Sequence, residues 1–507
     1  MSEEKKLNMP QSLLLLLLII GSVAVCIRLK TGGPMIGLFF SWIIIYLFCK
    51  WLKIKYDHVV SGAYDAIRVV VPTLCLLMAI GVMIGTWLQS GTIATIIAGG
   101  LKLIDPTWLL PLTLVFCAVL SLVTGTSYGS VGSAGVAMMA IGNAMGINPG
   151  MVAGAVICGA MFGDKLSPLS DTTNLAPAVA GAKLNDHVRS MLWTTLPTFV
   201  ISLVLFVILG ISQTSGGYEE ENLLVYTEAL QGEFKLGLVT LIPAAVIIVL
   251  LLCKVNAIVS LGLSSVCAGA VAFFCQGATL QSIIRVAYNG YTTQIEEAVL
   301  KTILNRGGMS SMLQYVAIIC FAVGMGGMLD RLGVLDNILR AITGRINSDG
   351  GLIFATLLVG YITSLISCSQ PMSHVLTGNM MKPLFKERKI APEILSRSLE
   401  DAGTLSGPMI PWHGYCVYMA GTLGVAWSAF FPYLFLLYLT PFFQHLLRSL
   451  PVISIRHVED ETNRSRDEAR KGKRRENHDR RQNLYFSDTG TPNACPDASG
   501  PSSAVVV

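Results

Sequence analysis

Long apolar runs, each of a length that can cross a lipid bilayer, recur along this chain of 507 residues. A helix needs about 20 apolar residues to span the hydrocarbon core of a membrane. Hydrophobic residues make up 53% of the chain and charged residues only 13%, which leaves little polar surface for a water-soluble domain. The clearest apolar runs lie at 12–26, 36–49, 69–88, 108–123, 197–211, 236–253, 257–275 and 418–447. We therefore predict an all-α polytopic membrane protein embedded in the lipid bilayer, with about 10–12 transmembrane helices, some of them broken or re-entrant.

Charge and cysteine content narrow the function further. The net charge of +5 is small for this length, so we expect no nucleic-acid partner. The 12 cysteines are scattered singly through apolar segments and form no Cys-x-x-Cys pair. This spacing suggests neither a zinc site nor a disulfide framework, and no cofactor is expected.

The segment 163–174 places three charged side chains, Asp164, Lys165 and Asp171, between two apolar runs. Charge at membrane depth is costly and usually functional. Pro168 interrupts a helix here, and a broken helix frees carbonyl oxygens, which together with carboxylates are ligands that Na⁺ accepts. Asp164 and Asp171 are therefore predicted to bind either Na⁺ or a proton. The alternative is that Asp164 pairs with Lys165 or a helix end and only positions the backbone. Lys165 either replaces a cation in the empty site or extends to the membrane interface.

Two further segments combine polar residues with helix breakers. The segment 124–130 offers five hydroxyls among glycines after an apolar run, and suits either a cavity lining or close helix packing. The segment 400–414 contains Asp401, two prolines and His413. His413 either relays protons or binds an organic carboxylate, or is a hydrogen-bonded core histidine.

Similar features occur in the same order in two parts of the chain, and the basic residues of equivalent loops differ. Lys382, Lys386, Arg388 and Lys389 have no counterpart at 143–149. Under the positive-inside rule, equivalent loops then lie on opposite sides of the membrane, as in two inverted-topology repeats, with both termini cytoplasmic. The predicted divisions are N-terminal helices at 1–67, repeat 1 at 68–210, linker helices at 211–309, repeat 2 at 310–449 and a disordered cytoplasmic tail at 450–507.

Three motifs together resemble those of one family. The stretch 162–174 (FGDKLSPLSDTTN) resembles the characteristic segment of the NhaC family of Na⁺/H⁺ antiporters. The stretches 124–127 (TGTS), 399–405 (LEDAGTL) and 410–413 (IPWH) are similar to further family segments. The resemblance covers about 1–450 and implies a secondary transporter of the bacterial inner membrane, driven by ion gradients, and not an enzyme. It also implies inverted repeats with re-entrant hairpins and often a homodimer.

The leading hypothesis is Na⁺/H⁺ antiport by alternating access. The residues expected to bind the ion and complete the cavity are Asp164, Asp171, Ser167, Ser170, Thr172, Asn174, Thr126, Ser127, Asp401 and His413. The alternative is exchange of an organic anion (malate, lactate or an amino acid) coupled to Na⁺ and H⁺, since the family includes malate and lactate exchangers; Trp412 would then shape the pocket. A remote alternative is an intramembrane aspartyl protease using Asp65 and Asp164, but position 161 is Met where such proteases need Gly.

Overall fold

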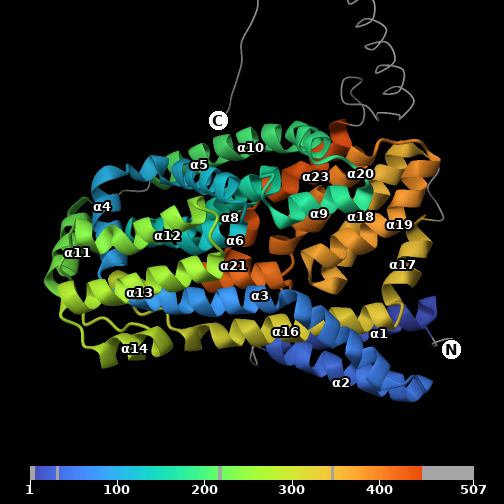
Figure 1. Cartoon of the computed structure of the whole chain (residues 1–507), viewed down its shortest axis with the longest axis horizontal. Helices are drawn as coiled ribbons and strands as arrows, with labels where there is room; N and C mark the ends of the chain where they lie inside the picture. The colour runs from blue at the N-terminus through green and yellow to red at the C-terminus, as the bar shows by residue number, and fades with distance from the viewer. Residues whose placement is uncertain (1–5, 30–33, 215–219, 344–347, 448–507) are drawn as a thin grey trace, which may run out of the picture. The chain divides into compact units, whose positions relative to one another are not determined.

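The computed structural model describes residues 6–29, 34–214, 220–343 and 348–447. The predicted tail at 450–507 lies outside these residues. Within the described ranges every regular element is a helix and no strand is formed, so the all-α prediction is confirmed (Figure 1).

Eight helices of the described chain are long and apolar enough to cross a membrane, and the number rises to eleven if each of three bent helix pairs counts as one span. The upper number agrees with the predicted range, and the bent pairs are the predicted broken segments. The eight are α1 (Met9–Arg28), α2 (Pro34–Leu52), α3 (Tyr56–Gln89), α5 (Pro106–Thr124), α10 (Leu184–Thr214), α13 (Ala257–Gln276), α16 (Met309–Arg331) and α18 (Asp349–Ser367). The bent pairs are α8 (Pro149–Leu166) with α9 (Asp171–Ala180), α11 (Glu220–Glu233) with α12 (Ile242–Leu252), and α22 (Trp427–Phe430) with α23 (Phe435–Leu447).

The remaining helices connect or complete these spans. They are α4 (Thr92–Leu103), α6 (Ser127–Ser130), α7 (Val136–Ala144), α14 (Leu280–Asn289), α15 (Ala298–Leu304), α17 (Val334–Thr343), α19 (Gln370–Glu387), α20 (Pro392–Leu399) and α21 (Gly414–Leu423). Two π-helical turns, η1 (Val131–Gly135) and η3 (Glu400–Thr404), and three 3₁₀ turns, η2 (Leu238–Leu241), η4 (Gly407–Met409) and η5 (Phe431–Tyr433), lie between them. π-Helical turns inside α-helices are rare and occur often at functional sites.

Residues with left-handed backbone conformation end several helices. Gly125 ends α5 at φ 70°, and Cys368 ends α18 at φ 55°. The apolar run 418–447 is interrupted in the same way, because Gly424 ends α21 at φ 69°. Such a conformation suits glycine, whereas other residues adopt it at a cost.

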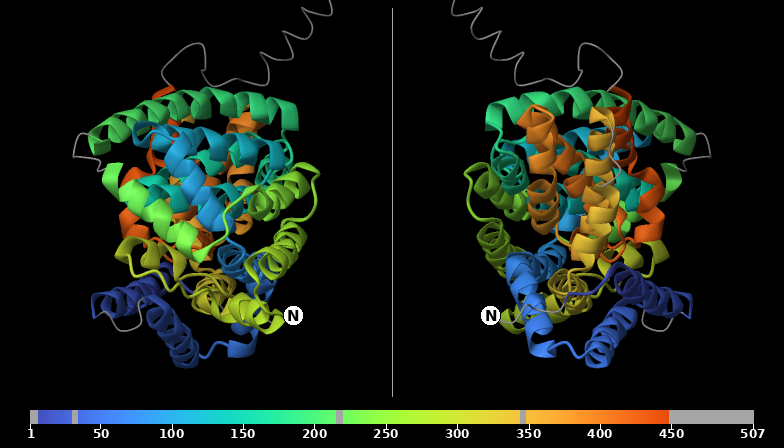
Figure 2. Two further views of the ribbon diagram at one scale, coloured as in Figure 1. Left: turned by 90° about the vertical axis from the view of Figure 1, so that its left-hand side faces the viewer. Right: turned by 90° about the vertical axis from the view of Figure 1, so that its right-hand side faces the viewer.

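Glycines set the closest helix contacts. A Cβ atom added at Gly159 of α8 would lie 2.3 Å from the Leu114 carbonyl oxygen of α5. One added at Gly163 would lie 2.2 Å from the Ala118 carbonyl oxygen of the same helix. This four-residue glycine spacing lets two helix backbones touch inside a membrane. Gly62 of α3 and Gly327 of α16 form a similar contact, and α3 and α16 run side by side in Figure 1. The helices α1 and α2 pack against each other, and Figure 2 shows them, in dark blue, at the edge opposite α10.

The helix order of the two predicted repeats is alike. In each, a long helix (α3, α16) is followed by a glycine with positive φ and a short helix (α4, α17). A long helix that ends at a residue with positive φ comes next (α5, α18), and later a helix that begins at a proline (α8, α20). The domain boundaries and the inverted topology stay predictions.

Candidate functional site

The Asp164 carboxyl lies in the last turn of α8, directly after the glycine contact with α5. That contact brings it to the break after α5, where Ser127 begins α6. The Ser127 hydroxyl donates a hydrogen bond to Asp164 Oδ2, and the Asp164 side chain is buried, with 7% of the residue exposed. The structure therefore joins two of the predicted segments at one carboxylate.

The break between α8 and α9 is held by the polar residues that the sequence identified. Asn174 donates to the carbonyl oxygens of Pro168 (2.9 Å) and Ser170 (2.7 Å), and the hydroxyls of Ser170 and Thr172 are 3.1 Å apart. The Ser167 backbone N–H donates to the Asp164 carbonyl at 3.1 Å. The bonds of Asn174 and of the Ser167 backbone satisfy carbonyl groups that the break between the two helices leaves without helical partners.

Ser170 and Asp171 lie close to Asp164 in different ways. The buried Ser170 hydroxyl approaches the Asp164 carboxylate. Asp171 is exposed at the start of α9, yet near enough for its charge to act on Asp164. The buried Asp164 and the exposed Asp171 are therefore close enough for their charges to interact.

Lys165 forms an ion pair with Asp401, a residue 236 positions away in the π-helical turn η3. Both side chains are 0% exposed. A charge in such a place is stable only when it is paired and hydrogen-bonded. The buried Lys165 side chain therefore does not extend to a membrane interface, and its replacement of a cation in the site stays a prediction.

Three tyrosines adjoin this site: Tyr128 belongs to the predicted hydroxyl-rich segment 124–130, whereas the sequence did not identify Tyr415 and Tyr418. The ring of Tyr128 lies 4.7 Å from that of Tyr415 and 4.6 Å from that of Tyr418, centroid to centroid. The buried Tyr415 hydroxyl has no hydrogen-bond partner within the described residues, and the residue lies close to Ser127 and Asp164. The available signal was that Tyr415 and Tyr418 directly follow the predicted segment 400–414.

Thr126 and His413 cap short helices at the site's breaks. The Thr126 hydroxyl accepts a bond from the Gly129 backbone N–H at 3.3 Å. His413 Nδ1 accepts a bond from the Tyr415 backbone N–H at 3.0 Å, so its proton is on Nε2, and the described residues offer that buried nitrogen no partner. His374 Nε2 lies 3.1 Å from the Thr404 hydroxyl, as expected for a hydrogen-bonded core histidine.

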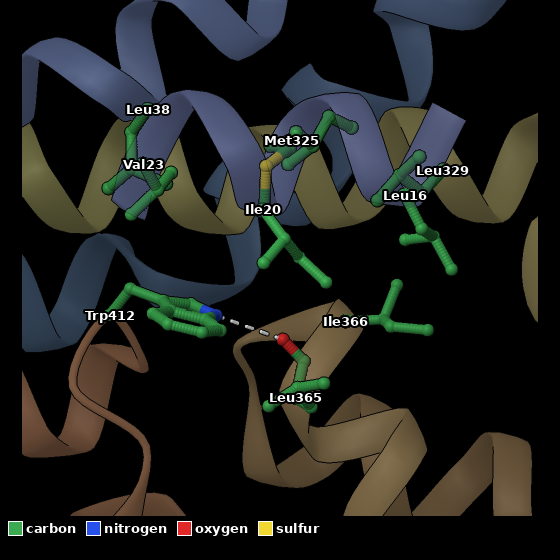
Figure 3. A pocket seen from close by; sticks show the side chains of 10 residues that line it. Leu16, Ile20, Val23, Leu38, Met325, Leu329, Leu365, Ile366 and Trp412 are labelled. Carbon is green, nitrogen blue, oxygen red and sulfur yellow. Dashed lines mark hydrogen bonds between the residues drawn. The ribbon is translucent and has the colours of Figure 1, made fainter. Parts of the chain in front are cut away.

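Trp412 lines an apolar pocket (Figure 3). Its indole N–H donates to the Leu365 carbonyl oxygen at 3.1 Å. The pocket is lined by Leu16, Ile19, Ile20, Val23, Leu38, Met325, Leu329, Leu365, Ile366 and Trp412. This lining offers neither Na⁺ nor a carboxylate a partner.

The site can be compared with known proteins on this basis. Residues 159–448 match the model of the Na⁺/H⁺ antiporter family, a range that includes Asp164, Asp171, Asp401 and His413. The chain belongs to this family. It is 36% identical to the Na⁺/H⁺ antiporter NhaC of Alkalihalophilus pseudofirmus over 440 residues, which are 87% of this chain and 95% of that protein. It is 32% identical to the Na⁺/H⁺ antiporter NhaC of Bacillus subtilis, over 88% of this chain and 99% of that one.

Another family relative is named for a different exchange reaction. The malate-2H⁺/Na⁺-lactate antiporter of Bacillus subtilis is 35% identical over 79% of this chain and 86% of that protein. Family membership confirms the resemblance found in the sequence and indicates a transporter rather than an enzyme. Asp65, the second aspartate of the protease hypothesis, is exposed and pairs with Arg331 at 2.9 Å.

Proposed function

We propose that this protein exchanges Na⁺ for protons across the bacterial inner membrane by alternating access. The observation that carries the proposal is the buried Asp164 carboxylate, held by Ser127 between two broken helices and adjacent to a buried Lys165–Asp401 ion pair. The family relatives named as Na⁺/H⁺ antiporters support the same reaction.

Exchange requires that Na⁺ and a proton compete for one group, and the Asp164 carboxyl is that group. Its carboxylate and the hydroxyls of Ser127 and Ser170 are oxygen ligands of the kind that Na⁺ accepts. A proton on the same carboxyl removes the negative charge and with it the attraction for Na⁺. Each Na⁺ that binds therefore displaces a proton, and the reverse occurs on the other side of the membrane.

Lys165 supplies the positive charge that balances the buried Asp401 carboxylate. In the structure its ammonium neutralises Asp401, and Lys165 directly follows Asp164 in sequence, so a buried positive charge accompanies the two carboxylates. Arriving Na⁺ competes with this ammonium for the carboxylates. Asp171, which is exposed at the start of α9, attracts the cation. The residues that surround the site and shape the helix breaks are Thr126, Ser167, Thr172, Asn174 and His413.

The deciding experiment follows proton movement in proteoliposomes after a Na⁺ pulse, with wild type and Asp164→Asn. Wild type should move protons on Na⁺ alone. Asp164→Asn should be inserted and folded but move none, because an amide neither carries the proton nor neutralises Na⁺. Full exchange in this variant would exclude Asp164 from the mechanism.

Organic-anion exchange is the second candidate, and it rests on the malate and lactate relative. It has less support in the site, since Trp412 faces an apolar pocket and His413 Nδ1 is engaged in a helix cap. Repeating the Na⁺ pulse with malate or lactate separates the two: proton movement only in the presence of the acid would favour the second candidate. The homodimer, the cytoplasmic termini and the two-repeat division are part of the same proposal.

A further inference from the structure

The proposed exchange makes no use of the apolar pocket beside Trp412, and α1 bridges this pocket instead of filling it. Asn337 of α17 donates to the Ser12 hydroxyl of α1 at 2.9 Å. Further along, Gly37 of α2 lies so close to α1 that a Cβ added there would be 2.6 Å from the Val23 Cα atom. The pocket lies between these two points of attachment, with α16 and the end of α18 on its other sides (Figure 3).

The lining of the pocket excludes polar ligands. Trp412 carries the one side-chain nitrogen among the described residues that line it, and this N–H already donates to the Leu365 carbonyl oxygen at 3.1 Å. The other lining side chains are those of Leu, Ile, Val and Met. A buried water needs two or more polar partners, and a charged group needs a counter-charge, so neither is stabilised here. The pocket is also narrow, which suits a thin apolar chain.

The pocket adjoins the outward-facing side of α1. Ile20 lines the pocket and is itself 46% exposed, and Figure 3 shows its side chain pointing from α1 toward Leu365 and Ile366. On the same side of α1, Leu17 is 69% exposed and Leu13 is 46% exposed. Such a stripe on a spanning helix of a membrane transporter faces the hydrocarbon of the bilayer. Lipid acyl chains are therefore the molecules that surround the pocket at Ile20.

We propose that an acyl chain of a membrane phospholipid occupies this pocket, between α1 and Trp412. An apolar side chain that borders empty space loses dispersion contacts, and an acyl chain restores them without requiring a hydrogen bond. The chain supports Trp412 from one side. Trp412 directly precedes His413, whose Nδ1 caps α21 through the Tyr415 N–H at 3.0 Å, so the lipid stabilises the backbone that leads into this helix. The inference does not depend on which ion the protein exchanges.

The fluorescence of Trp412 tests the proposal. The chain has seven tryptophans, so the protein is prepared with Trp412 retained and the others replaced by phenylalanine. It is reconstituted into phosphatidylcholine that carries bromine at a known position of one acyl chain, because bromine quenches indole fluorescence only at short range. We expect strong quenching of Trp412, with a maximum at one bromine position along the chain.

Two variants on α1 distinguish a chain in the pocket from the surrounding bilayer. Ile20→Phe places a ring in the pocket and should remove most of the quenching. Leu17→Phe adds the same ring on the exposed stripe, outside the residues that line the pocket, and should leave the quenching unchanged. Equal quenching in these two variants, or none in the parent protein, would overturn the proposal and indicate an empty pocket or one covered by protein, such as a second copy of this chain.

A second measurement uses the protein with all its tryptophans. Phosphatidylcholine added to the delipidated protein in detergent should raise the melting temperature of wild type and of Leu17→Phe by the same amount, and that of Ile20→Phe by less. An equal rise in all three would overturn the proposal. Neither result bears on Na⁺-driven proton movement at Asp164, so failure of the lipid site and failure of the proposed exchange are separate outcomes.

Discussion

Replacing Lys165 with methionine tests whether its ammonium occupies the place of a transported cation. Methionine keeps most of the volume of the side chain and removes its charge, so Asp401 is left buried without its counter-charge. Both partners are 0% exposed, and removal of one member of a buried ion pair costs about 3–5 kcal/mol. A large domain loses about 2 °C of melting temperature per kcal/mol, so the Na⁺-free variant should melt about 6–10 °C below wild type.

Sodium should reverse much of that loss. Without the competing ammonium, Na⁺ is the cation that neutralises both Asp164 and Asp401, and it should bind the variant more tightly than wild type. A ligand at 100 times its dissociation constant stabilises the folded state by about 2.7 kcal/mol, and tighter binding increases this amount at a fixed Na⁺ concentration.

Thermal unfolding in detergent, with NaCl or choline chloride, measures both effects. The exposed Lys183 provides the control, since Lys183→Met changes charge without opening a buried pair. A Lys165→Met protein that melts with wild type in choline chloride would refute the buried-pair argument. A Na⁺-induced shift no larger than that of wild type would refute competition between the ammonium and Na⁺.

Three further predictions concern the immediate surroundings of Asp164. Ser127→Ala removes a hydrogen bond to a charged group, worth about 1.5–3 kcal/mol, and should weaken Na⁺ binding roughly tenfold to a hundredfold by calorimetry; a change below twofold would contradict its role as a ligand. Asp171→Asn alters an exposed charge worth up to about 1 kcal/mol, so half-maximal Na⁺ in the flux assay should rise less than about fivefold, and abolished exchange would place Asp171 among the essential ligands instead. Gly163→Ala places a Cβ 2.2 Å from the Ala118 carbonyl oxygen and should lower both melting temperature and Na⁺ affinity, whereas Gly99→Ala, whose Cβ meets nothing within 4 Å, should stabilise its helix by up to about 1 kcal/mol. Equal melting of these two alanine variants would show that the α5–α8 contact does not position Asp164.

The helices and their breaks could be predicted because they depend on local chemistry. Apolar runs determine the spans, and Pro168 coincides with the break between α8 and α9. The apolar run 418–447 is interrupted at Gly424 and at the 3₁₀ turn that contains Pro432. A single glycine inside an apolar run does not by itself reveal a positive φ.

The charged contacts of the site could not be predicted in the same way. Ser127 and Asp164 are 37 residues apart and meet because Gly159 and Gly163 allow α5 and α8 to touch. Sequence patterns indicate that such glycines pack against something, but they do not name the helix on the other side. The orientation of Trp412 toward apolar side chains was likewise invisible, because it depends on α1 and α16, which are remote in sequence.

The predicted two-repeat organisation offers a reason for the Lys165–Asp401 ion pair, whose members lie 236 residues apart in sequence. In the helix order of the halves, α8 corresponds to α20 with η3, and these are the two segments that carry every buried Asp, Glu, Lys and Arg of the described chain. The α8 segment carries one buried carboxyl and one buried cation, whereas α20 with η3 carries three carboxyls and one cation. Lys165 of the first segment balances Asp401 of the second. In a chain of this kind, the partner of an intramembrane charge should therefore be sought at the equivalent helix of the other half, and not among its neighbours in sequence.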